Sequence, residues 1–314
     1  MQTYPVIAGP TATGKTALAI ALAQALDGEV VSADSMQVYD GVWIGTARPV
    51  PAEKQGIPHH LQGFLPLHES YSVARYVEDA YRVFEEIYGR GKTPVLCGGT
   101  GLYIQSFMEN IQYFPQPSDP QLRRELLEIG RDQGGGALLE HLRQVDPVTA
   151  ARLHENDLHR IVRALEVYRI TGETLTQQSE RSRSVPPPYS GCLFVLQYRE
   201  RELLYRRIDA RVDRMMEQGL IEEARRVLQQ QPEATVLQAI GYKEFLPYFA
   251  GDCTLSQAVE TLKRETRRYA KRQMSWFRRM LYAQPIFLED YADFAALTQD
   301  ILERYRRFIE GRVE

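Results

Sequence analysis

The residues best suited to chemistry stand near the N-terminus, in the run Gly9-Pro10-Thr11-Ala12-Thr13-Gly14-Lys15-Thr16. This run fills every required position of the pattern G-x-x-x-x-G-K-[ST], in which consecutive backbone N–H groups surround an anion. In such a loop the lysine reaches a terminal phosphate, and the last hydroxyl can hold Mg²⁺. The sequence therefore predicts a di- or triphosphate site at residues 9–16, with Lys15 on the phosphates and Thr16 as the metal ligand.

The elements on either side of this loop fit the same prediction. A short apolar run, Tyr4 to Ala8, precedes the loop and indicates a strand, and an alanine- and leucine-rich stretch, Ala17 to Leu26, indicates a helix after it. Because the N-terminus of that helix points at the bound anion, its dipole adds to the backbone N–H groups.

A second polar cluster follows the next predicted strand, Glu29 to Ser32, and contains Asp34. A phosphate-loop NTPase normally carries an acidic metal ligand at the end of a further buried strand. The best such strand, Thr93 to Cys97, runs instead into Gly98-Gly99-Thr100-Gly101. The carboxylate and its polar neighbours therefore favour an acceptor substrate over nucleotide hydrolysis, although a turn or N-cap role for Asp34 fits the spacing equally well.

The stretch from Lys263 to Arg279 is strongly basic in a chain whose net charge is −3. It holds eight Lys and Arg residues against the single acid Glu265 and lacks Pro and Gly, which indicates a long helix. We interpret it as a footprint for nucleic-acid phosphates that lies outside the diphosphate site, centred on Arg268, Lys271 and Arg272. A solvated charged face is the alternative.

The composition restricts the class of protein. With 314 residues and 44% hydrophobic content the chain can bury a large core. Its three cysteines show no paired spacing, so they indicate neither a disulfide framework nor a zinc site. The apolar run Ala17 to Leu26 is too short to span a membrane and follows Lys15, so we expect a cytoplasmic protein with no membrane partner.

Breaks in the pattern along the chain indicate an α/β fold with an inserted helical module. Strands and helices such as Val73 to Tyr88 alternate up to about residue 112, which predicts a parallel sheet with helices on both faces, of the P-loop NTPase type. The proline-rich segment 115–120 marks a boundary, and residues 119–182 indicate helices. Three prolines at 186–188 end that module, and a strand, Leu193 to Tyr198, resumes the sheet. The expected domains are the first part of the core (1–114), an all-helical insertion (115–188), to which the family resemblance described next assigns tRNA binding, and the completion of the core with basic C-terminal helices (189–314).

Several blocks together resemble the tRNA dimethylallyltransferase family, also called tRNA isopentenyltransferases or IPP transferases. The resemblance covers roughly residues 4–280. The blocks that carry it are Gly9 to Thr16, Asp34-Ser35-Met36-Gln37-Val38-Tyr39, Gly45-Thr46-Ala47-Arg48-Pro49, Pro58-His59-His60-Leu61, Gly98-Gly99-Thr100-Gly101-Leu102-Tyr103, Asp146-Pro147, His159-Arg160, Arg163 to Val167, Ile240-Gly241-Tyr242-Lys243-Glu244 and Arg268-Tyr269-Ala270-Lys271-Arg272-Gln273.

The phosphate loop at residues 9–16 is of the kind found in ATP-binding and other nucleotide-binding proteins. The resemblance implies that it serves a prenyl transfer rather than nucleotide hydrolysis. The donor would be dimethylallyl diphosphate, and the acceptor the exocyclic amine of the adenosine immediately 3′ of the anticodon in tRNAs that read UNN codons. Charge accumulates on the departing diphosphate, where the loop amides, Lys15, Thr16 and Mg²⁺ would stabilise it. The resemblance adds Arg207 as a guanidinium on the diphosphate. No further acidic residue is needed, because no water has to be aimed at a phosphate.

For the acceptor we expect Asp34 to be the general base that takes a proton from the poorly nucleophilic amine. Ser35 and Gln37 would read the edge of the adenine after it leaves the anticodon-loop stack. The resemblance places Thr100 at the channel mouth opposite Asp34. It assigns to the tRNA the residues Asp34, Ser35, Met36, Gln37, Thr100, Arg123, His159, Arg160, Ile161, Val162 and Arg163. The pair His59-His60 matches a family motif without an assigned role.

Three other functions remain open at this stage. A small-molecule P-loop kinase would also place an acid after its second strand, but it needs neither the insertion nor the basic helix. A non-catalytic RNA-binding P-loop protein has no use for the Asp34 cluster, and an isopentenyltransferase for free adenylate needs no surface of tRNA size. The expected partners are the anticodon stem-loop of tRNA and dimethylallyl diphosphate. No obligate protein partner is indicated, and we expect a monomer.

Overall fold

The structure is a computed structural model that describes residues 1–113 and 119–311. The chain divides into two compact units: Met1–Met108 together with Pro187–Glu314, called here the core unit, and Glu109–Pro186, called the insertion unit. The sequence placed these boundaries after residues 114 and 188. The first of these positions, and most of the proline-rich segment that suggested it, lie outside the described residues.

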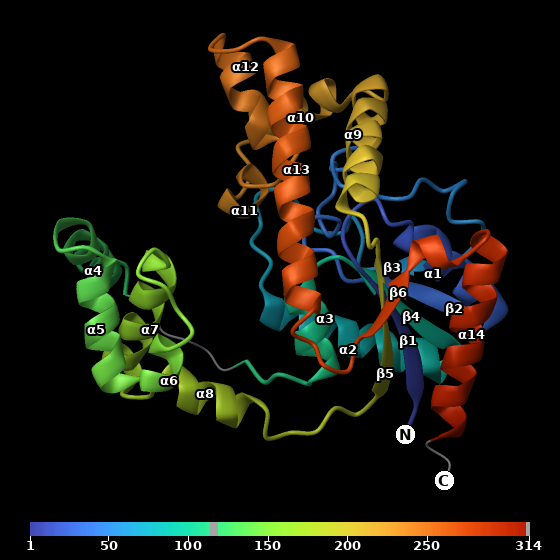
Figure 1. Cartoon of the computed structure of the whole chain (residues 1–314), viewed down its shortest axis with the longest axis horizontal. Helices are drawn as coiled ribbons and strands as arrows, with labels where there is room; N and C mark the ends of the chain where they lie inside the picture. The colour runs from blue at the N-terminus through green and yellow to red at the C-terminus, as the bar shows by residue number, and fades with distance from the viewer. Residues whose placement is uncertain (114–118, 312–314) are drawn as a thin grey trace. The chain divides into compact units, whose positions relative to one another are not determined.

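The core unit is built on a six-stranded sheet in which every pair of neighbours is parallel (Figure 1). The spatial order is β3-β2-β4-β1-β5-β6. Val6 of β1 lies between Leu96 of β4 and Leu193 of β5, so the strand that follows the insertion pairs directly with the first strand. The strands are β1 (Thr3–Ala8), β2 (Gly28–Ser32), β3 (His59–His60), β4 (Thr93–Gly98), β5 (Ser190–Gln197) and β6 (Gln284–Phe287).

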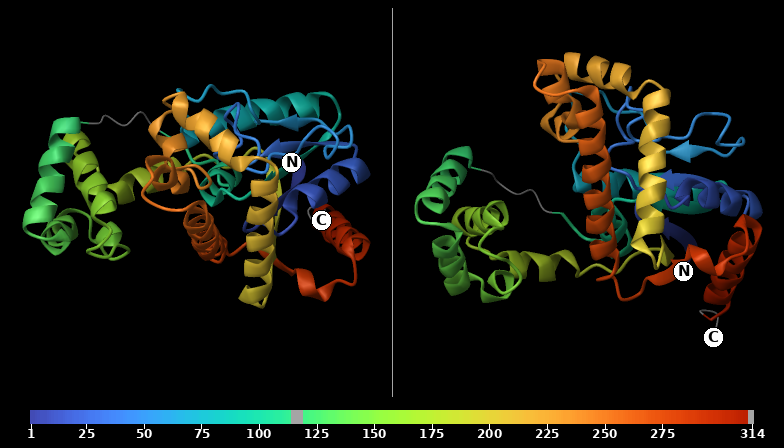
Figure 2. Two further views of the ribbon diagram at one scale, coloured as in Figure 1. Left: turned by 90° about the horizontal axis from the view of Figure 1, so that it is seen from above. Right: turned by 45° about the horizontal axis from the view of Figure 1, so that its top comes forward.

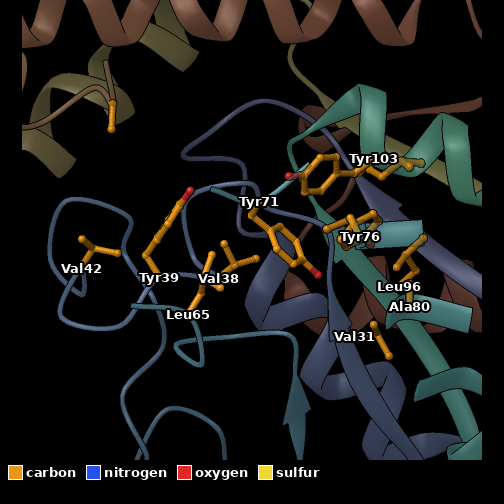
Figure 3. Packing of buried hydrophobic residues seen from close by; sticks show 14 of the residues in the cluster. Val31, Val38, Tyr39, Val42, Leu65, Tyr71, Tyr76, Ala80, Leu96 and Tyr103 are labelled. Atoms are coloured by element: carbon orange, nitrogen blue, oxygen red, sulfur yellow. The ribbon is translucent and has the colours of Figure 1, made fainter. Parts of the chain in front are cut away.

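Helices cover both faces of this sheet, as the sequence predicted. Because successive strand residues point to opposite faces, β1 sends Val6 into one buried cluster and Ile7 into another. The first cluster includes residues of α2 (Val73–Gly89) and α3 (Gly101–Met108). Figure 3 shows part of it, where the rings of Tyr76 and Tyr103 stack with centroids 4.1 Å apart. The second cluster is formed with α1 (Lys15–Ala25) and α14 (Phe294–Glu310).

The insertion unit is all-helical in its described part and has a core of its own, centred on Leu126, Leu142, Ile161 and Leu165. All of its described helices lie within residues 119–182, the range for which the sequence indicated helices. Its helices are α4 (Pro120–Asp132), α5 (Gly135–Val145), α6 (Pro147–Ala150), α7 (Leu158–Thr171) and α8 (Leu175–Ser182).

After β5 the core unit continues in helices, of which α9 and α13 lie side by side (Figures 1 and 2). A capping box of Thr254 and Gln257 starts α13, and the basic stretch forms its C-terminal part. The ion pairs of Lys263 with Asp213 at 2.7 Å and of Arg267 with Asp209 at 2.5 Å join α13 to α9. The helices are α9 (Arg201–Glu217), α10 (Leu220–Gln229), α11 (Ala234–Leu237), α12 (Leu246–Ala250) and α13 (Leu255–Phe277). Across the described ranges, no helix is both long and apolar enough to cross a membrane.

Candidate active site

A cavity of about 390 Å³ lies within the core unit at the carboxyl ends of β1, β2 and β4. This edge of a parallel sheet is where such folds usually bind ligands. The phosphate loop contributes Thr11, Lys15 and Thr16 to the wall, and the turn after β2 contributes Asp34. Two separate segments, both predicted to do chemistry, therefore share one cavity.

The phosphate loop has the conformation that its sequence predicts. Gly14 adopts φ +84°, a left-handed conformation that favours glycine, immediately before Lys15 begins α1. The Lys15 ammonium donates to Pro10 O at 2.7 Å, across the loop. Burial lowers the pKa of Lys15 to about 8, with the nearby Arg211 adding to this effect while Asp34 opposes it. Arg207 of α9 donates from Nε to Ala12 O at 3.0 Å, so this predicted residue does reach the loop.

Asp34 caps a turn, one of the two roles that the sequence left open, and it also lines the cavity. Its Oδ1 accepts from the backbone N–H groups of Met36 at 2.9 Å and Gln37 at 3.3 Å, which is a turn-capping arrangement. Asp34 also lines the cavity together with Ser35, Met36 and Gln37. Because both turn bonds go to one oxygen, capping and proton acceptance are compatible in the same carboxylate.

Thr100 supports this turn from the neighbouring strand end. Its hydroxyl oxygen accepts from Ser35 N at 3.0 Å and bonds to Ser35 Oγ at 3.3 Å. Tyr269 of α13 is hydrogen-bonded to Thr100. Burial and the Asp34 charge raise the pKa of the Tyr269 hydroxyl, and the hydrogen bond to Thr100 acts in the opposite direction. Thr100 thus connects the turn of Asp34 to α13 as well as to the glycine turn.

Gln273 of α13 is a site residue to which the sequence assigned no role. Its Oε1 accepts from Thr11 N at 3.1 Å, and its Nε2 donates to Gly99 O at 2.9 Å. A Cβ on Gly99 would lie 2.3 Å from that Nε2, so only glycine permits this approach. Gln273 therefore bridges the phosphate loop and the glycine turn.

Sequence reasoning also missed Arg211 and the apolar wall of the cavity. Arg211 lies one helical turn after Arg207 on α9, and that i, i+4 spacing was the only available signal. Burial lowers its pKa to about 10, against the favourable charge of Asp34. Apolar side chains from α9, α10, α13 and the segment before Gly241 line the same cavity: Val212, Met215, Leu220, Ala239, Ile240 and Leu262.

The three cations expected on one tRNA surface have different surroundings. Arg268 forms an ion pair with Glu265 at 2.6 Å, one turn earlier on α13. Lys271 lines a smaller hollow with residues of α9. Arg272 is exposed and also lines the main cavity, and its place outside the diphosphate site stays a prediction. The surroundings differ for a geometric reason: successive helix residues point about 100° apart, so adjacent cations face different surfaces.

The two histidines of the P-H-H-L motif also have separate environments. His60 Nε2 lies 2.6 Å from Glu29 Oε2, and Arg90 lies 2.8 Å from the same oxygen. These contacts fix β3 at the sheet edge. His59 lines the cavity, and its Nδ1 bonds to Ile57 O at 2.9 Å. Burial lowers the pKa of His59, which favours the neutral ring.

In the insertion unit, the residues predicted to contact tRNA fall into two groups. Arg123 and Arg163 both bind the buried carboxylate of Glu166, at 2.8 and 2.9 Å. The side chains of Ile161 and Val162 are buried in the core of the unit, whereas His159 and Arg160 are exposed on α7. A tRNA contact stays a prediction for each of these residues. The exposed side chains of His159 and Arg160 are the ones that a tRNA could reach without a rearrangement of the unit.

Oxygen ligands at the phosphate loop suit a magnesium ion. Mg²⁺ prefers oxygen ligands, keeps several waters and is usually held by one or two side chains together with substrate phosphates. Thr16, the metal ligand that the sequence predicts, supplies such an oxygen to the cavity. Among the described residues no group of three or more His, Cys, Asp or Glu side chains could hold a metal without such a substrate.

The parallel sheet, the phosphate loop and the cavity shared with Asp34 and an apolar wall define a P-loop transferase class. Comparison with known proteins agrees with this class. A family model described as IPP transferase matches residues 37–280, and one described as isopentenyl transferase matches residues 1–61. The chain belongs to the tRNA dimethylallyltransferase family of prenyltransferases, as its sequence blocks indicated.

Individual relatives resemble the chain over most of their length. A tRNA dimethylallyltransferase from Carboxydothermus hydrogenoformans is 46% identical, with 87% of this chain and 88% of the relative covered. One from Geobacillus kaustophilus is 44% identical over 98% and 96%. The crystal structure of the tRNA isopentenylpyrophosphate transferase from Bacillus halodurans matches with TM-score 0.72 at 40% identity, covering 99% and 96%. A eukaryotic dimethylallyltransferase acting on tRNA matches with TM-score 0.80 at 31% identity, covering 99% and 80%.

Proposed function

We propose that this protein transfers a dimethylallyl group from dimethylallyl diphosphate to a tRNA adenosine and releases diphosphate. The acceptor is the exocyclic amine of the adenosine immediately 3′ of the anticodon, in tRNAs that read UNN codons. The observation that carries the proposal is the composition of the cavity. It joins a phosphate loop and a carboxylate to an apolar wall that includes Val212, Met215 and Leu220, where a five-carbon prenyl group can be buried.

The donor side follows from charge. The allylic C–O bond breaks early, so negative charge develops on the departing diphosphate. Preorganised donors that meet this charge lower the barrier. Lys15 and the loop amides would meet the diphosphate, and Arg207, which reaches the loop from α9, would add its guanidinium. Arg211 adds a second cation on the cavity wall. Bound Mg²⁺, held by Thr16 and the diphosphate, would neutralise part of the same charge.

The acceptor side needs a proton acceptor, because the adenine amine is a weak nucleophile. Asp34 lines the cavity and can take the proton as the new C–N bond forms. The adenosine has to leave the anticodon-loop stack to reach this carboxylate. Ser35 and Gln37 line the cavity beside Asp34 and would contact the base.

The proposal extends to the surroundings of the enzyme. We propose the anticodon stem-loop of tRNA as the macromolecular partner, with exposed cations such as Lys271, Arg160 and Arg268 near its phosphates. We also propose that the protein acts in the cytoplasm and as a monomer.

The test is to incubate the protein with unmodified tRNA, Mg²⁺ and dimethylallyl diphosphate, then digest the RNA and analyse the nucleosides by mass spectrometry. A five-carbon mass gain on adenosine 3′ of the anticodon supports the proposal. A parallel reaction with free adenosine monophosphate should give no product. Conversion of ATP to ADP with a small acceptor would support a kinase instead, and tRNA binding without product would support a non-catalytic protein.

A further inference from the structure

A buried carboxylate on α10, Glu223, is hydrogen-bonded to the loop that follows the Asp34 turn. Its Oε2 accepts from the backbone N–H groups of Trp43 and Ile44, both at 2.9 Å. Its Oε1 accepts from Gly45 N at 2.8 Å and from the Tyr242 hydroxyl at 3.0 Å. Three consecutive backbone N–H groups thus surround one carboxylate, as in an anion-binding nest.

This clamp fixes a wall of the cavity. Gly45 lines the cavity together with the next two residues, Thr46 and Ala47. Tyr242 packs so closely on the loop that a Cβ on Gly45 would lie 2.8 Å from its hydroxyl oxygen. The loop is therefore held by the Glu223 carboxylate and has little room to shift toward Tyr242.

The loop in turn fixes the amide of Gln37. Gln37 Nε2 donates to Thr46 O at 3.1 Å. Because a carbonyl oxygen can only accept, this contact determines which end of the amide carries the NH₂ group. Gln37 Oε1 then accepts from Gln62 Nε2 at 2.9 Å. The bond to Thr46 O uses one of the two N–H groups of the Gln37 amide, and Gln37 lines the cavity, so the second N–H is the group that could donate to a ligand there.

We infer that Glu223 is a positioning residue for adenine recognition: by clamping the loop at residues 43–45 it holds Thr46 O where it orients the Gln37 amide toward the acceptor base. The inference rests on the proposed function, because it supposes that the acceptor is an adenosine. The remaining Gln37 N–H matches a ring nitrogen of adenine that accepts a hydrogen bond, N1 or N7. Without the clamp, the loop and the amide lose this fixed orientation.

The experiment compares anticodon stem-loop RNAs that carry adenosine, 1-deazaadenosine or 7-deazaadenosine at the acceptor position. Each analogue keeps the amine but lacks one ring acceptor. For each RNA kcat/KM is measured with wild type, Glu223→Gln and Tyr242→Phe. The control is Glu222→Gln, which alters the exposed neighbour of Glu223 on α10. Comparing the same substrate pair between enzymes cancels differences in intrinsic amine reactivity.

Wild type and the control should prefer adenosine over one of the two analogues by on the order of 10-fold. In Glu223→Gln that ratio should fall toward one, because the amide replaces an acceptor with a donor that faces backbone N–H or hydroxyl donors. KM for dimethylallyl diphosphate should change little, because the four hydrogen bonds of Glu223 go to residues 43–45 and Tyr242 rather than to the phosphate loop. Tyr242→Phe removes one of the four bonds and should give an intermediate ratio.

Three results would overturn the inference. The first is an unchanged ratio in Glu223→Gln with kcat/KM lowered equally for all RNAs, which would indicate a general structural role. The second is a wild-type enzyme with equal kcat/KM for all three RNAs, which would show that Gln37 reads no ring nitrogen. The third is loss of folding in Glu223→Gln, seen by thermal unfolding, together with a wild-type ratio in Tyr242→Phe. Failure of wild type to prenylate the adenosine RNA would instead refute the proposed function itself.

Discussion

The lowered pKa of Lys15 predicts a specific dependence of donor capture on pH. Burial lowers this pKa from 10.5 to about 8, so the ammonium is present below pH 8 and is lost as the pH rises through that value. If only the charged form binds diphosphate, the competent fraction is about 0.9 at pH 7 and about 0.1 at pH 9. The value of kcat/KM for dimethylallyl diphosphate should therefore fall about tenfold over these two pH units.

The decisive comparison is between kcat/KM and kcat, measured at saturating tRNA from pH 6.5 to 9.5, roughly the range that brackets this pKa. Bound diphosphate raises the pKa of Lys15, so kcat should stay level to higher pH than kcat/KM. In Lys15→Arg the cation does not titrate in this range, and the fall should disappear even if activity is lower. Arg211, with its pKa lowered only to about 10, stays charged in most of the range. A level wild-type kcat/KM up to pH 9.5, or an identical fall in Lys15→Arg, would refute the reasoning.

Other changes test the acceptor side, the basic helix and the insertion unit. Asp34→Asn keeps the oxygen that caps the turn, so kcat should fall by about 10²-fold or more while tRNA affinity in a filter-binding assay stays nearly constant; lost binding with normal turnover would contradict a base. Lys271→Ala should lower the slope of log K for tRNA against log salt by roughly 0.7–0.9, with kcat unchanged. Arg272→Ala should in addition lower kcat, because this residue lines the cavity, and equal kcat in the two variants would argue against that position. Glu166→Gln removes the buried carboxylate that two partly exposed arginines share and should destabilise the insertion unit by about 1–3 kcal/mol in urea unfolding, whereas a loss below about 0.5 kcal/mol would contradict this role. Although burial opposes it, the arginines hold the pKa of Glu166 below its usual value, so this stabilisation should be present above the ordinary carboxyl pKa and disappear as the pH falls through the lowered one.

Sequence patterns predicted the elements whose signals are local. The strand expected at Tyr4 to Ala8 is β1, and the helix expected at Val73 to Tyr88 is α2, each correct to within one residue at its ends. β6 was not predicted, because it has four residues and contains Pro285, which can occupy only an edge strand or a strand end. β3 has two residues and depends on the contact of His60 with Glu29, which no local pattern indicates.

The site divides in the same way. The phosphate loop is a continuous segment whose function depends on its own backbone, so its sequence was sufficient to predict it. The residues that local patterns missed are Arg211, Gln273 and Glu223. The contacts of Gln273 and Glu223 with the loops around the cavity are with residues more than 150 positions away in the chain. Such residues are indistinguishable in sequence from ordinary helix-surface polar residues. Their roles could be found only after the fold had brought α9, α10 and α13 to the loops.

The discontinuity of the core unit has a consequence for how the protein folds during synthesis. β1 pairs with β5, and β5 pairs with β6. The sheet therefore cannot be completed until the chain has emerged from the ribosome as far as Phe287, the last residue of β6. The insertion unit is continuous from Glu109 to Pro186 and has its own apolar core. It can therefore fold before β5 and β6, the partner strands that follow it, have been synthesised. During that interval the edge of β1 that will pair with β5 is unprotected. The nascent chain should therefore need chaperone protection most after β4 has emerged and before β5 has emerged. The length of this interval, and with it the yield of folded protein, should depend on the speed of translation across the insertion.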